Sequence, residues 1–479
     1  MGSGNNWPRM DKMSAQDLKI VGGTNPGRYE KISIESTYNM VVSGRALVPY
    51  SGYKSLVGIG DDPNAIPRGL FVSQLGNFMI AVIGNSVYKI DTTLSSVHLG
   101  DVSSSGASVD IAENGNSEIA ISDGSEYFVY NYSKNTFLKE DIGIKTSSID
   151  SALGFIFATV PSSNTFSYSA VNDATTAFPN TNQGEIGSDK VVCVRAFQER
   201  IYVFGQRHTK IWRDLGLALN PFQLDQSIII ESGCINKDSV AIGFGMMAWV
   251  SKSEDGSAEI LASTGGYPTP ISTDGIDFKL SKLTSPENCS GFIFQEDGHV
   301  FYQITFYDDG ITLVYDFTTK MFLYATDEKL SNHIAKKVVN FNGTYYFISF
   351  SNATLYSMSS QITAYDGSII PRIRITPPLK TIANDYFRIS YLQMVAEQGM
   401  NEDPMYVDIS FSVDGGVSFS SAKRIEFSNF SNNFKVMQMF RLGAARDWSF
   451  QFRFYGKGRP VITRAYVEVK DEDISAPFE

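Results

Sequence analysis

The sequence contains few of the residue types that most often carry catalysis or bind metals. Its four histidines and three cysteines are spread over 479 residues, and no HExxH or CxxC spacing groups them. We therefore expect no metal, no cofactor and no catalytic residue. The histidines are expected at the surface or satisfied in the interior, and the cysteines as buried free thiols of a reducing compartment. These residues are His98, His208, His299, His333, Cys193, Cys234 and Cys289.

Long apolar runs and a secretion signal are also lacking. No run approaches the roughly 20 apolar residues of a membrane span, and Met1–Trp7 lacks the basic and apolar regions of a signal peptide. Core-forming residues are nevertheless plentiful, since 43% of the chain is hydrophobic and it holds 24 tyrosines and 33 phenylalanines. Aromatic residues favour strands, and we expect no significant helix.

A hairpin pattern recurs along the chain and is clearest at residues 76–90. There the apolar run Phe78–Ile83 and the run Ser86–Ile90 flank Gly84-Asn85, a pair that supplies the positive φ of a tight reversal. A nearly continuous apolar strand must be covered on both faces, so these are expected to be central strands. Six similar units follow, at residues 118–132, 154–171, 200–213, 247–261, 299–317 and 345–358.

The spacing of these hairpins indicates the fold. Successive turns lie 38 to 54 residues apart, and a period of about 40–50 residues with four short strands each is typical of propeller blades. We predict an all-β chain with a β-propeller of six or seven blades. Seven is favoured, and six stays open because the turn at Ser162–Asn164 is the weakest. Short alternating strands return near the end, strictly so in Phe450–Phe454, which predicts a C-terminal antiparallel β-sandwich.

The predicted organisation has three parts. Residues 1–45 form an extended segment that packs on the C-terminal platform or on a neighbouring subunit, residues 46–365 form the propeller, and residues 366–479 form the β-sandwich platform. Pro371 and Pro377-Pro378 stiffen the chain and block sheet continuation at the second boundary. Asn172–Asp189 is expected to be a long loop without strands, and Asp214–Gln226 a short helix or inter-blade loop.

One local motif matches the Asp-box of sialidase-like propellers, Ser-x-Asp-x-Gly-x-x-aromatic. Its residues are Ser412, Asp414, Gly416 and Phe419. The Asp carboxylate can accept backbone N–H groups across a tight hairpin, while the glycine takes the φ that the turn demands and the aromatic ring plugs the adjacent core. We interpret the motif as a structural turn, with a link to glycoside chemistry as the less favoured alternative.

Charge is distributed unevenly. The chain carries a net charge of −11, all of it in residues 1–365, because residues 366–479 hold 14 basic and 14 acidic residues. An acidic surface does not bind nucleic acid through its phosphates. Residues 423–464 form a basic band, in which Arg441, Arg446 and Arg453 are candidate subunit-interface residues. This band and the acidic Asp471-Glu472-Asp473 could pair head to tail between identical copies; solvated strand faces explain both nearly as well.

Three stretches resemble the tail nozzle proteins of short-tailed phages, also called packaged-DNA stabilisation proteins or tail accessory factors. The first is Tyr38-Asn39-Met40 with Pro49–Tyr53 and Gly58-Ile59; the second is Gln198–Gly205 with Thr209–Trp212 and Ser232-Gly233-Cys234; the third is Arg441–Arg446 with Phe452-Arg453 and Ala465–Val469. Residues 1–30 and 172–189 match no part of the family pattern.

The resemblance implies a structural virion protein of a podovirus tail, assembled in the host cytoplasm. It implies six copies in a ring below the portal and its adaptor protein, forming a tube that conducts double-stranded DNA without binding it specifically. The ring would help retain the packaged genome and anchor tail spikes or fibres. An acidic propeller suits a conduit, because contacts with the DNA phosphates would slow the passage of DNA in a salt-dependent way.

Two other functions remain open at this point. The Ser412–Phe419 motif is compatible with a propeller glycosidase, although no convergent arginines or paired carboxylates are recognisable in the sequence. A carbohydrate-binding propeller is the second alternative, with Trp212 and Trp249 as candidate exposed contacts.

Overall fold

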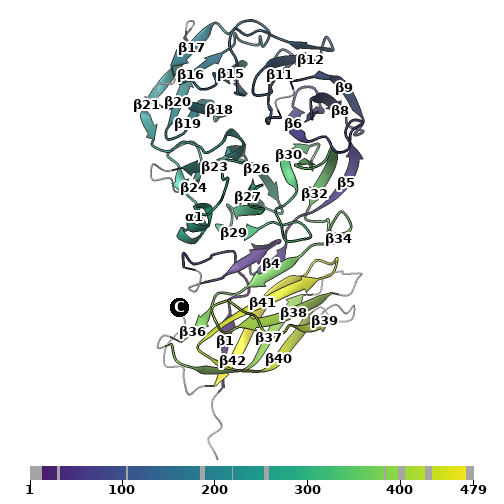
Figure 1. Ribbon diagram of the computed structural model, residues 1–479, viewed down its shortest axis with the longest axis vertical. Coiled ribbons are helices and arrows are strands. Elements are labelled where there is room, and N and C mark those ends of the chain that lie inside the picture. The colour runs from purple at the N-terminus through teal and green to yellow at the C-terminus, as the bar shows by residue number, and fades with distance from the viewer. Residues whose placement is uncertain are drawn as a thin grey trace, which may run out of the picture. The chain divides into compact units, whose positions relative to one another are not determined.

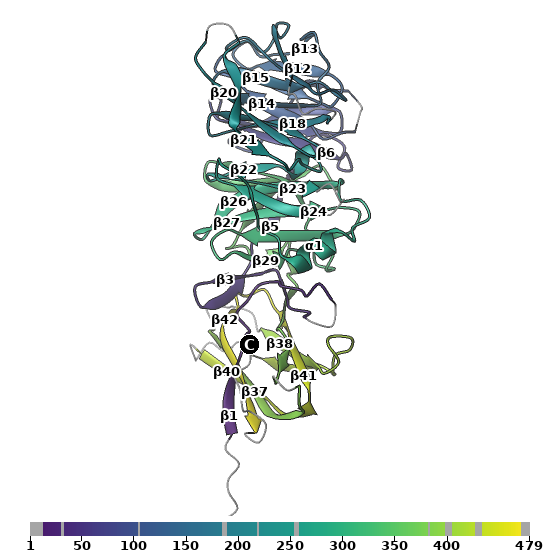
Figure 2. The ribbon, with the colours of Figure 1, turned by 90° about the vertical axis from the view of Figure 1, so that its left-hand side faces the viewer.

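The structure is a computed structural model of the chain. It describes residues 13–29, 33–103, 106–183, 189–217, 220–252, 258–381, 384–397, 405–426 and 434–470. Contacts divide the chain into two compact units. We call residues 52–320 with 331–362 the propeller unit, and residues 1–51, 321–330 and 363–479 the sandwich unit. Figures 1 and 2 show both units in two views.

The propeller unit consists of antiparallel sheets that follow one another around a ring, and Figure 1 shows β6, β18, β26 and β30 toward its centre. Blades one to three comprise β6 (Pro67–Ser73), β7 (Phe78–Ile83), β8 (Ser86–Ile90), β9 (Ser96–Asp101); β10 (Asp110–Glu113), β11 (Glu118–Ser122), β12 (Tyr127–Asn131), β13 (Thr136–Lys139); and β14 (Ser148–Ala152), β15 (Phe155–Thr159), β16 (Thr165–Tyr168), β17 (Asn180–Gln183).

The remaining blades continue in the same order. Blades four to six comprise β18 (Val191–Phe197), β19 (Arg200–Gly205), β20 (Thr209–Asp214), β21 (Phe222–Ile230); β22 (Ala241–Gly243), β23 (Met246–Lys252), β24 (Ala258–Ser263), β25 (Thr269–Pro270); and β26 (Cys289–Glu296), β27 (His299–Phe306), β28 (Ile311–Asp316). The seventh comprises β30 (Ala335–Phe341), β31 (Thr344–Ser349), β32 (Thr354–Ser359) and β5 (Gly52–Gly58). In the described part of the chain the count is therefore seven, as favoured from the sequence.

Blade seven closes the ring because it combines strands from both ends of the propeller sequence. The early strand β5 pairs with β32 in an antiparallel register that sets Gly58 opposite Thr354. Apolar side chains of β5, β7, β31 and their neighbours then form one core between blades seven and one. Equivalent cores lie between the following blades. Each apolar side chain buried in this way contributes about 1.5–3 kcal/mol.

The hairpins follow from local sequence. All six residues of β7 are buried, as expected for a strand covered on both faces. Gly84 has a φ of +56° at the turn into β8, a conformation that costs glycine nothing. The seven predicted hairpins are the second and third strands of the seven blades. The expected turn at Asp255-Gly256 lies outside the described residues.

The sandwich unit has two facing sheets. One follows the order β3-β4-β42-β37-β40, with β1 also paired to β42, and the other contains β29, β2, β35, β41, β38 and β39, with β36 paired to β41. The strands are β1 (Met13–Leu18), β2 (Ser36–Tyr38), β3 (Met40–Ser43), β4 (Ala46–Pro49), β29 (Met321–Tyr324), β33 (Ala364–Tyr365), β34 (Ser368–Ile369), β35 (Arg372–Ile375), β36 (Leu379–Lys380), β37 (Phe387–Glu397), β38 (Tyr406–Ser412), β39 (Lys423–Glu426), β40 (Phe434–Ala445), β41 (Asp447–Tyr455) and β42 (Val461–Lys470).

The core of the sandwich unit is built by alternation. In β41 Phe450, Phe452 and Phe454 are buried, whereas Gln451 is half-buried and Arg453 exposed. The inward residues join one apolar cluster with side chains of β37, β38 and β42. The alternation predicted from the sequence is thus present. The division at residues 46 and 366 into separate domains stays a prediction.

Two local expectations were wrong. Residues 172–189 include a strand, β17, which pairs with β16; this outer strand is Asn-Thr-Asn-Gln, so it forms without an apolar signal. The connection 214–226 contains the start of β21 instead of a helix. Short helices occur elsewhere, at α1 (Asp274–Leu280) and the 3-10 turn η1 (Lys237–Ser239). Among the described residues, no helix is long and apolar enough to cross a membrane.

Candidate functional site

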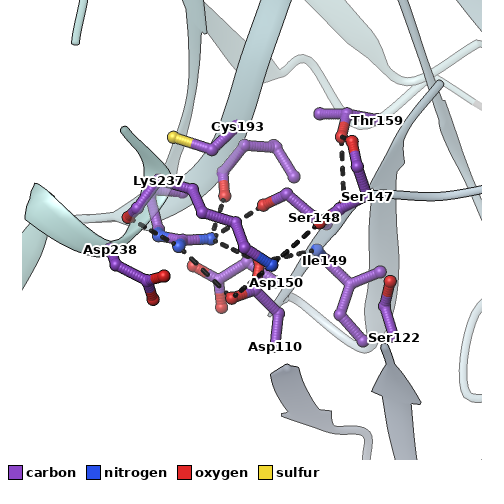
Figure 3. Close-up of polar contacts among 12 residues, drawn as sticks. Asp110, Ser122, Ser147, Ser148, Ile149, Asp150, Thr159, Cys193, Lys237 and Asp238 are labelled. Carbon is purple, nitrogen blue, oxygen red and sulfur yellow. Dashed lines mark hydrogen bonds and ion pairs between the residues drawn. The ribbon is translucent and has the colours of Figure 1, made fainter. Parts of the chain in front are cut away.

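A cluster of charged side chains lies where the innermost strands of the propeller meet (Figure 3). Arg195 comes from β18, and its Nη1 lies 3.2 Å from an Asp110 carboxylate oxygen on β10. The same Nη1 donates to Ser148 Oγ on β14 at 2.9 Å, and Nη2 donates to the carbonyl of Lys237 at 3.0 Å. The Arg195 and Asp110 side chains are only 12% and 9% exposed. One guanidinium therefore ties together strands of three blades and the turn η1.

A second ion pair extends the cluster to the remaining side of the ring. Asp238 in η1 accepts from Lys337 Nζ on β30 at 2.8 Å and from Ser108 Oγ. The Lys237 ammonium lies 3.5 Å from Asp110 and donates to the carbonyls of Ser108 and Ser147 at 3.1 and 2.9 Å. Figure 3 shows Asp110, Asp150 and Lys237 converging on one point. The turn η1 is held in place by the Asn236 side chain, which accepts from the Asp238 amide.

The charges are mutually stabilised. Burial alone would raise the pKa of Asp110, but the positive charges of Arg195 and Lys237 outweigh it and lower this pKa. The pKa of Asp238 is likewise held well below its usual range, because Lys337 and Lys237 outweigh the effect of burial. A buried carboxylate keeps its charge only where such partners are present.

Asp150 and Lys336 form the outer part of the same cluster. Burial raises the pKa of Asp150, and Arg195 offsets only part of this effect. Its two oxygens accept from the Ser151 and Ala196 amides, both at 2.8 Å. Burial lowers the pKa of Lys336 to about 8, and its Nζ donates to the Pro67 carbonyl at 2.9 Å.

This arrangement holds the inner strands of several blades together by electrostatic attraction. Asp110 and Asp238 are paired with Arg195, Lys237 and Lys337, whereas Asp150 and Lys336 form hydrogen bonds to backbone groups. The cluster joins the inner strands of blades one to four and seven to the turn η1, which precedes blade five. Sequence reasoning missed it, although a signal exists: Arg195 is a charged residue inside a strand, Val191–Phe197, that otherwise contains only apolar or small residues.

The Asp-box-like residues form a turn at the end of β38. Ser412 Oγ donates to Asp414 at 2.7 Å and accepts from the Gly416 amide at 2.9 Å. The Asp414 carboxylate also accepts from the Ser418 amide at 3.0 Å, and these hydrogen bonds lower its pKa. Gly416 has a φ of +89°, and Phe419 is half-buried. These contacts agree with the interpretation of a structural turn, which stays a prediction.

The three candidate interface arginines are all exposed on the sandwich unit. Arg441 lies on β40 with a φ of +62°, the guanidinium of Arg446 lies 4.7 Å from the centre of the Tyr386 ring, and Arg453 Nε donates to Gln451 at 3.1 Å. The structure does not bring the three into one contact cluster. Their predicted acidic counterpart, Asp471-Glu472-Asp473, lies outside the described residues.

Other candidate residues are distributed through the propeller. Trp249 is fully buried and Trp212 is 9% exposed, so neither is the exposed sugar contact that we had considered. All three cysteines are buried free thiols, and Cys193 Sγ lies 3.8 Å from Cys234 Sγ. His299 and His333 are buried while His98 and His208 are more exposed. Among the described residues no group of three or more metal-binding side chains occurs.

The fold and this cluster together define a scaffold: a seven-bladed propeller tied together at its centre by paired charges, with a β-sandwich formed by the rest of the chain. Comparison with known families gives a more specific result. The family model described as "Bacteriophage P22 Gp10, beta-propeller" matches residues 36–363, which is more than half of the chain. The protein therefore belongs to this phage family. It is a structural protein of a phage tail, and its place is in the virion.

Comparison with other proteins gives only weak similarities. No curated protein matches the sequence. Similar solved structures include a streptogramin B lyase (10% identity, 65% of this chain and 97% of that chain, TM-score 0.40). The N-terminal domain of Nup159 is also similar (11% identity, 68% of this chain and 99% of that chain, TM-score 0.41). A third is inactive virginiamycin B lyase from Staphylococcus aureus with quinupristin (12%, 64% and 99%, TM-score 0.43). Similarities this weak carry no inference about activity.

Proposed function

We propose that the protein is the nozzle subunit of a short phage tail and is not an enzyme. Copies, six by the family resemblance, assemble into a ring below the portal and the adaptor protein. The ring conducts DNA during ejection, helps to retain the packaged genome and anchors tail spikes or fibres. Assembly takes place in the host cytoplasm. The observation that carries the proposal is the match of residues 36–363 to the phage family.

Two physical features support a conduit between subunits. The inner strands of the propeller carry the paired charges of Asp110, Arg195, Lys237, Asp238 and Lys337, which tie the blades together at the propeller's own centre. DNA would then pass through the middle of a ring of copies. The net charge of −11 in residues 1–365 favours passage, because an acidic wall forms few of the phosphate contacts that slow a moving duplex.

The ring is tested by measuring the mass of the purified protein and by imaging virions. We expect a particle of six times the subunit mass of 52.9 kDa, with density for the protein at the tail tip. Glutamate at Arg441, Arg446 and Arg453 is expected to shift the population to monomers, whereas Arg424→Gln leaves the ring intact because Asp408 already pairs with Arg424 at 2.7 Å. A protein that stays monomeric at all concentrations and is absent from virions contradicts the proposal.

A further inference from the structure

Among the described residues, three arginines are fully buried: Arg68, Arg372 and Arg374. A buried guanidinium needs hydrogen-bond acceptors for its five N–H donors and a negative charge nearby. The three residues therefore provide an internal comparison of how this fold accommodates the same buried cation. Two of them meet that need within the chain and the third does not.

Arg374 and Arg68 are well satisfied. Arg374 donates to the carbonyls of Lys19, Ile20 and Gly23 at 2.7 to 2.9 Å, and it forms an ion pair with Glu35 at 2.6 Å. Arg68 donates to four carbonyls at 2.6 to 3.2 Å. The negative charge of Asp123 also acts on it.

Arg372 lies two residues before Arg374 on β35 but has a different environment. Its side chain makes two long hydrogen bonds, both of 3.3 Å, to the carbonyls of Gly456 and Thr363. Among the described residues, its Nε has no hydrogen-bond partner and the guanidinium forms no ion pair. Burial lowers the pKa of Arg372 to about 10, and no carboxylate contributes to this shift.

A cavity of about 210 Å³ adjoins this side chain within the sandwich unit. We call it the Arg372 cavity. Arg453 and Lys329 line it and are exposed. The charges that line it are these three cations and the single anion Glu328. A cavity of this size admits a side-chain carboxylate, and its charge is complementary to an anion.

We propose that the Arg372 cavity binds a carboxylate of an acidic protein segment, with Arg372 as the buried anchor and Arg453 and Lys329 at the rim. The carboxylate would neutralise a buried guanidinium that, among the described residues, has no negatively charged partner. A nucleic acid is disfavoured, because a duplex brings closely spaced phosphates toward Glu328 and cannot enter a cavity this small. The proposal concerns the sandwich unit alone and does not depend on formation of a ring.

The test compares the thermal unfolding midpoint in sodium acetate and in sodium chloride at equal ionic strength. Acetate is expected to raise the midpoint of the wild-type protein. Arg453→Gln at the rim is expected to need about tenfold more acetate for the same rise, as for the loss of one charge-assisted hydrogen bond. Arg388→Gln is the matched control, because Arg388 is exposed on the same unit, does not line the cavity and is not one of the candidate interface arginines.

A second variant and a peptide complete the test. Arg372→Met is expected to abolish the acetate response; if this variant does not fold, Arg453→Gln decides. A peptide with the sequence of residues 470–479 then identifies the source. If the peptide binds more tightly than acetate, the carboxylate comes from a copy of this chain. If the peptide binds no more tightly than acetate, the carboxylate comes from another acidic protein. An acetate response that is equal in wild type, Arg453→Gln and Arg388→Gln, or no acetate response beyond that of chloride, overturns the proposal. Ring formation is scored separately by mass, so the two proposals fail independently.

Discussion

Replacing Arg195 by methionine should destabilise the propeller more than any exposed charge substitution. Methionine keeps the length of the side chain but leaves Asp110 and Asp150 without their shared cation. Arg195 is 12% exposed and lies 3.2 Å from a carboxylate that is 9% exposed, so the pair is buried on both sides. Removing one partner of such a pair costs about 3–5 kcal/mol. We expect the free energy needed to open β10 and β18 to fall by this amount.

The effect should depend on pH in a defined direction. In the wild type the pKa of Asp110 is lowered. Its contribution to the free energy of unfolding is therefore fully present above about pH 4 and is lost as the pH falls through this lowered pKa. Without Arg195, Lys237 is the remaining cation that opposes the effect of burial, so the pKa of Asp110 should rise. The penalty for ionising it then disappears as the pH is lowered. The difference between Arg195→Met and wild type should therefore shrink between pH 7 and about pH 4.

Hydrogen exchange measured by mass spectrometry suits this experiment, because it reports opening strand by strand in a chain with two units. Arg213→Met is the matched control: Arg213 is 55% exposed and lies 3.9 Å from Asp225, so the expected cost is about 0–1 kcal/mol. Adding Asp110→Asn to Arg195→Met should recover at least about 1 kcal/mol. If Arg195→Met costs no more than Arg213→Met, the cluster does not lock the blades.

Three further predictions test other parts of the propeller. Gly233→Ala should lower the free energy of unfolding by about 1–3 kcal/mol, because a Cβ there would lie within 2.5 Å of backbone atoms of residues 205–207. Gly266 has open space around it, so Gly266→Ala should stay within about 0.5 kcal/mol of wild type. Urea unfolding measures both. Burial lowers the pKa of Lys336 from 10.5 to about 8. Between pH 8 and 10.5 this lysine is therefore protonated in the unfolded chain but mostly neutral in the folded one. Stability should therefore rise from pH 8 to 10.5, and Lys336→Met should flatten that rise; an unchanged pH profile in this variant contradicts the assignment. All three thiols are buried, so Ellman's reagent should label three per chain in guanidinium and almost none in native protein; rapid native labelling would show that the propeller opens.

The repeating part of the fold was readable from the sequence because each blade contributes one strongly patterned hairpin. Strands such as Phe78–Ile83 are apolar throughout, and turns such as Gly84 and Asp123-Gly124 separate them from their partners. The outer strands were harder to predict. Asn180–Gln183 has no apolar residue, and hydrogen bonds, including one between the Ser167 and Thr181 hydroxyls, hold this strand to its neighbour.

The central cluster could not be predicted for a different reason. Asp110, Arg195 and Lys237 are far apart in the sequence, and only the closed ring brings them within hydrogen-bonding distance. In the sequence Asp110 begins a strand, Arg195 lies inside one and Lys237 lies in a turn, so no local pattern links them. The same holds for Arg372 and Arg374, which are two residues apart and differ only in what distant segments place around them. Local patterns determine the strands, whereas long-range closure determines which polar groups meet.

The pairing of β5 with β32 has a consequence for synthesis of the protein. About 300 residues separate the two strands, and a ribosome adds roughly 5–20 residues per second. The first strand of the seventh blade must therefore wait on the order of 15–60 s for its partner to be translated. During that time the nascent chain exposes the unpaired backbone of β5 and an apolar blade face. Folding chaperones of the infected cell would meet this intermediate on every molecule produced, and any premature stop before residue 354 would leave an open, aggregation-prone arc instead of a smaller propeller.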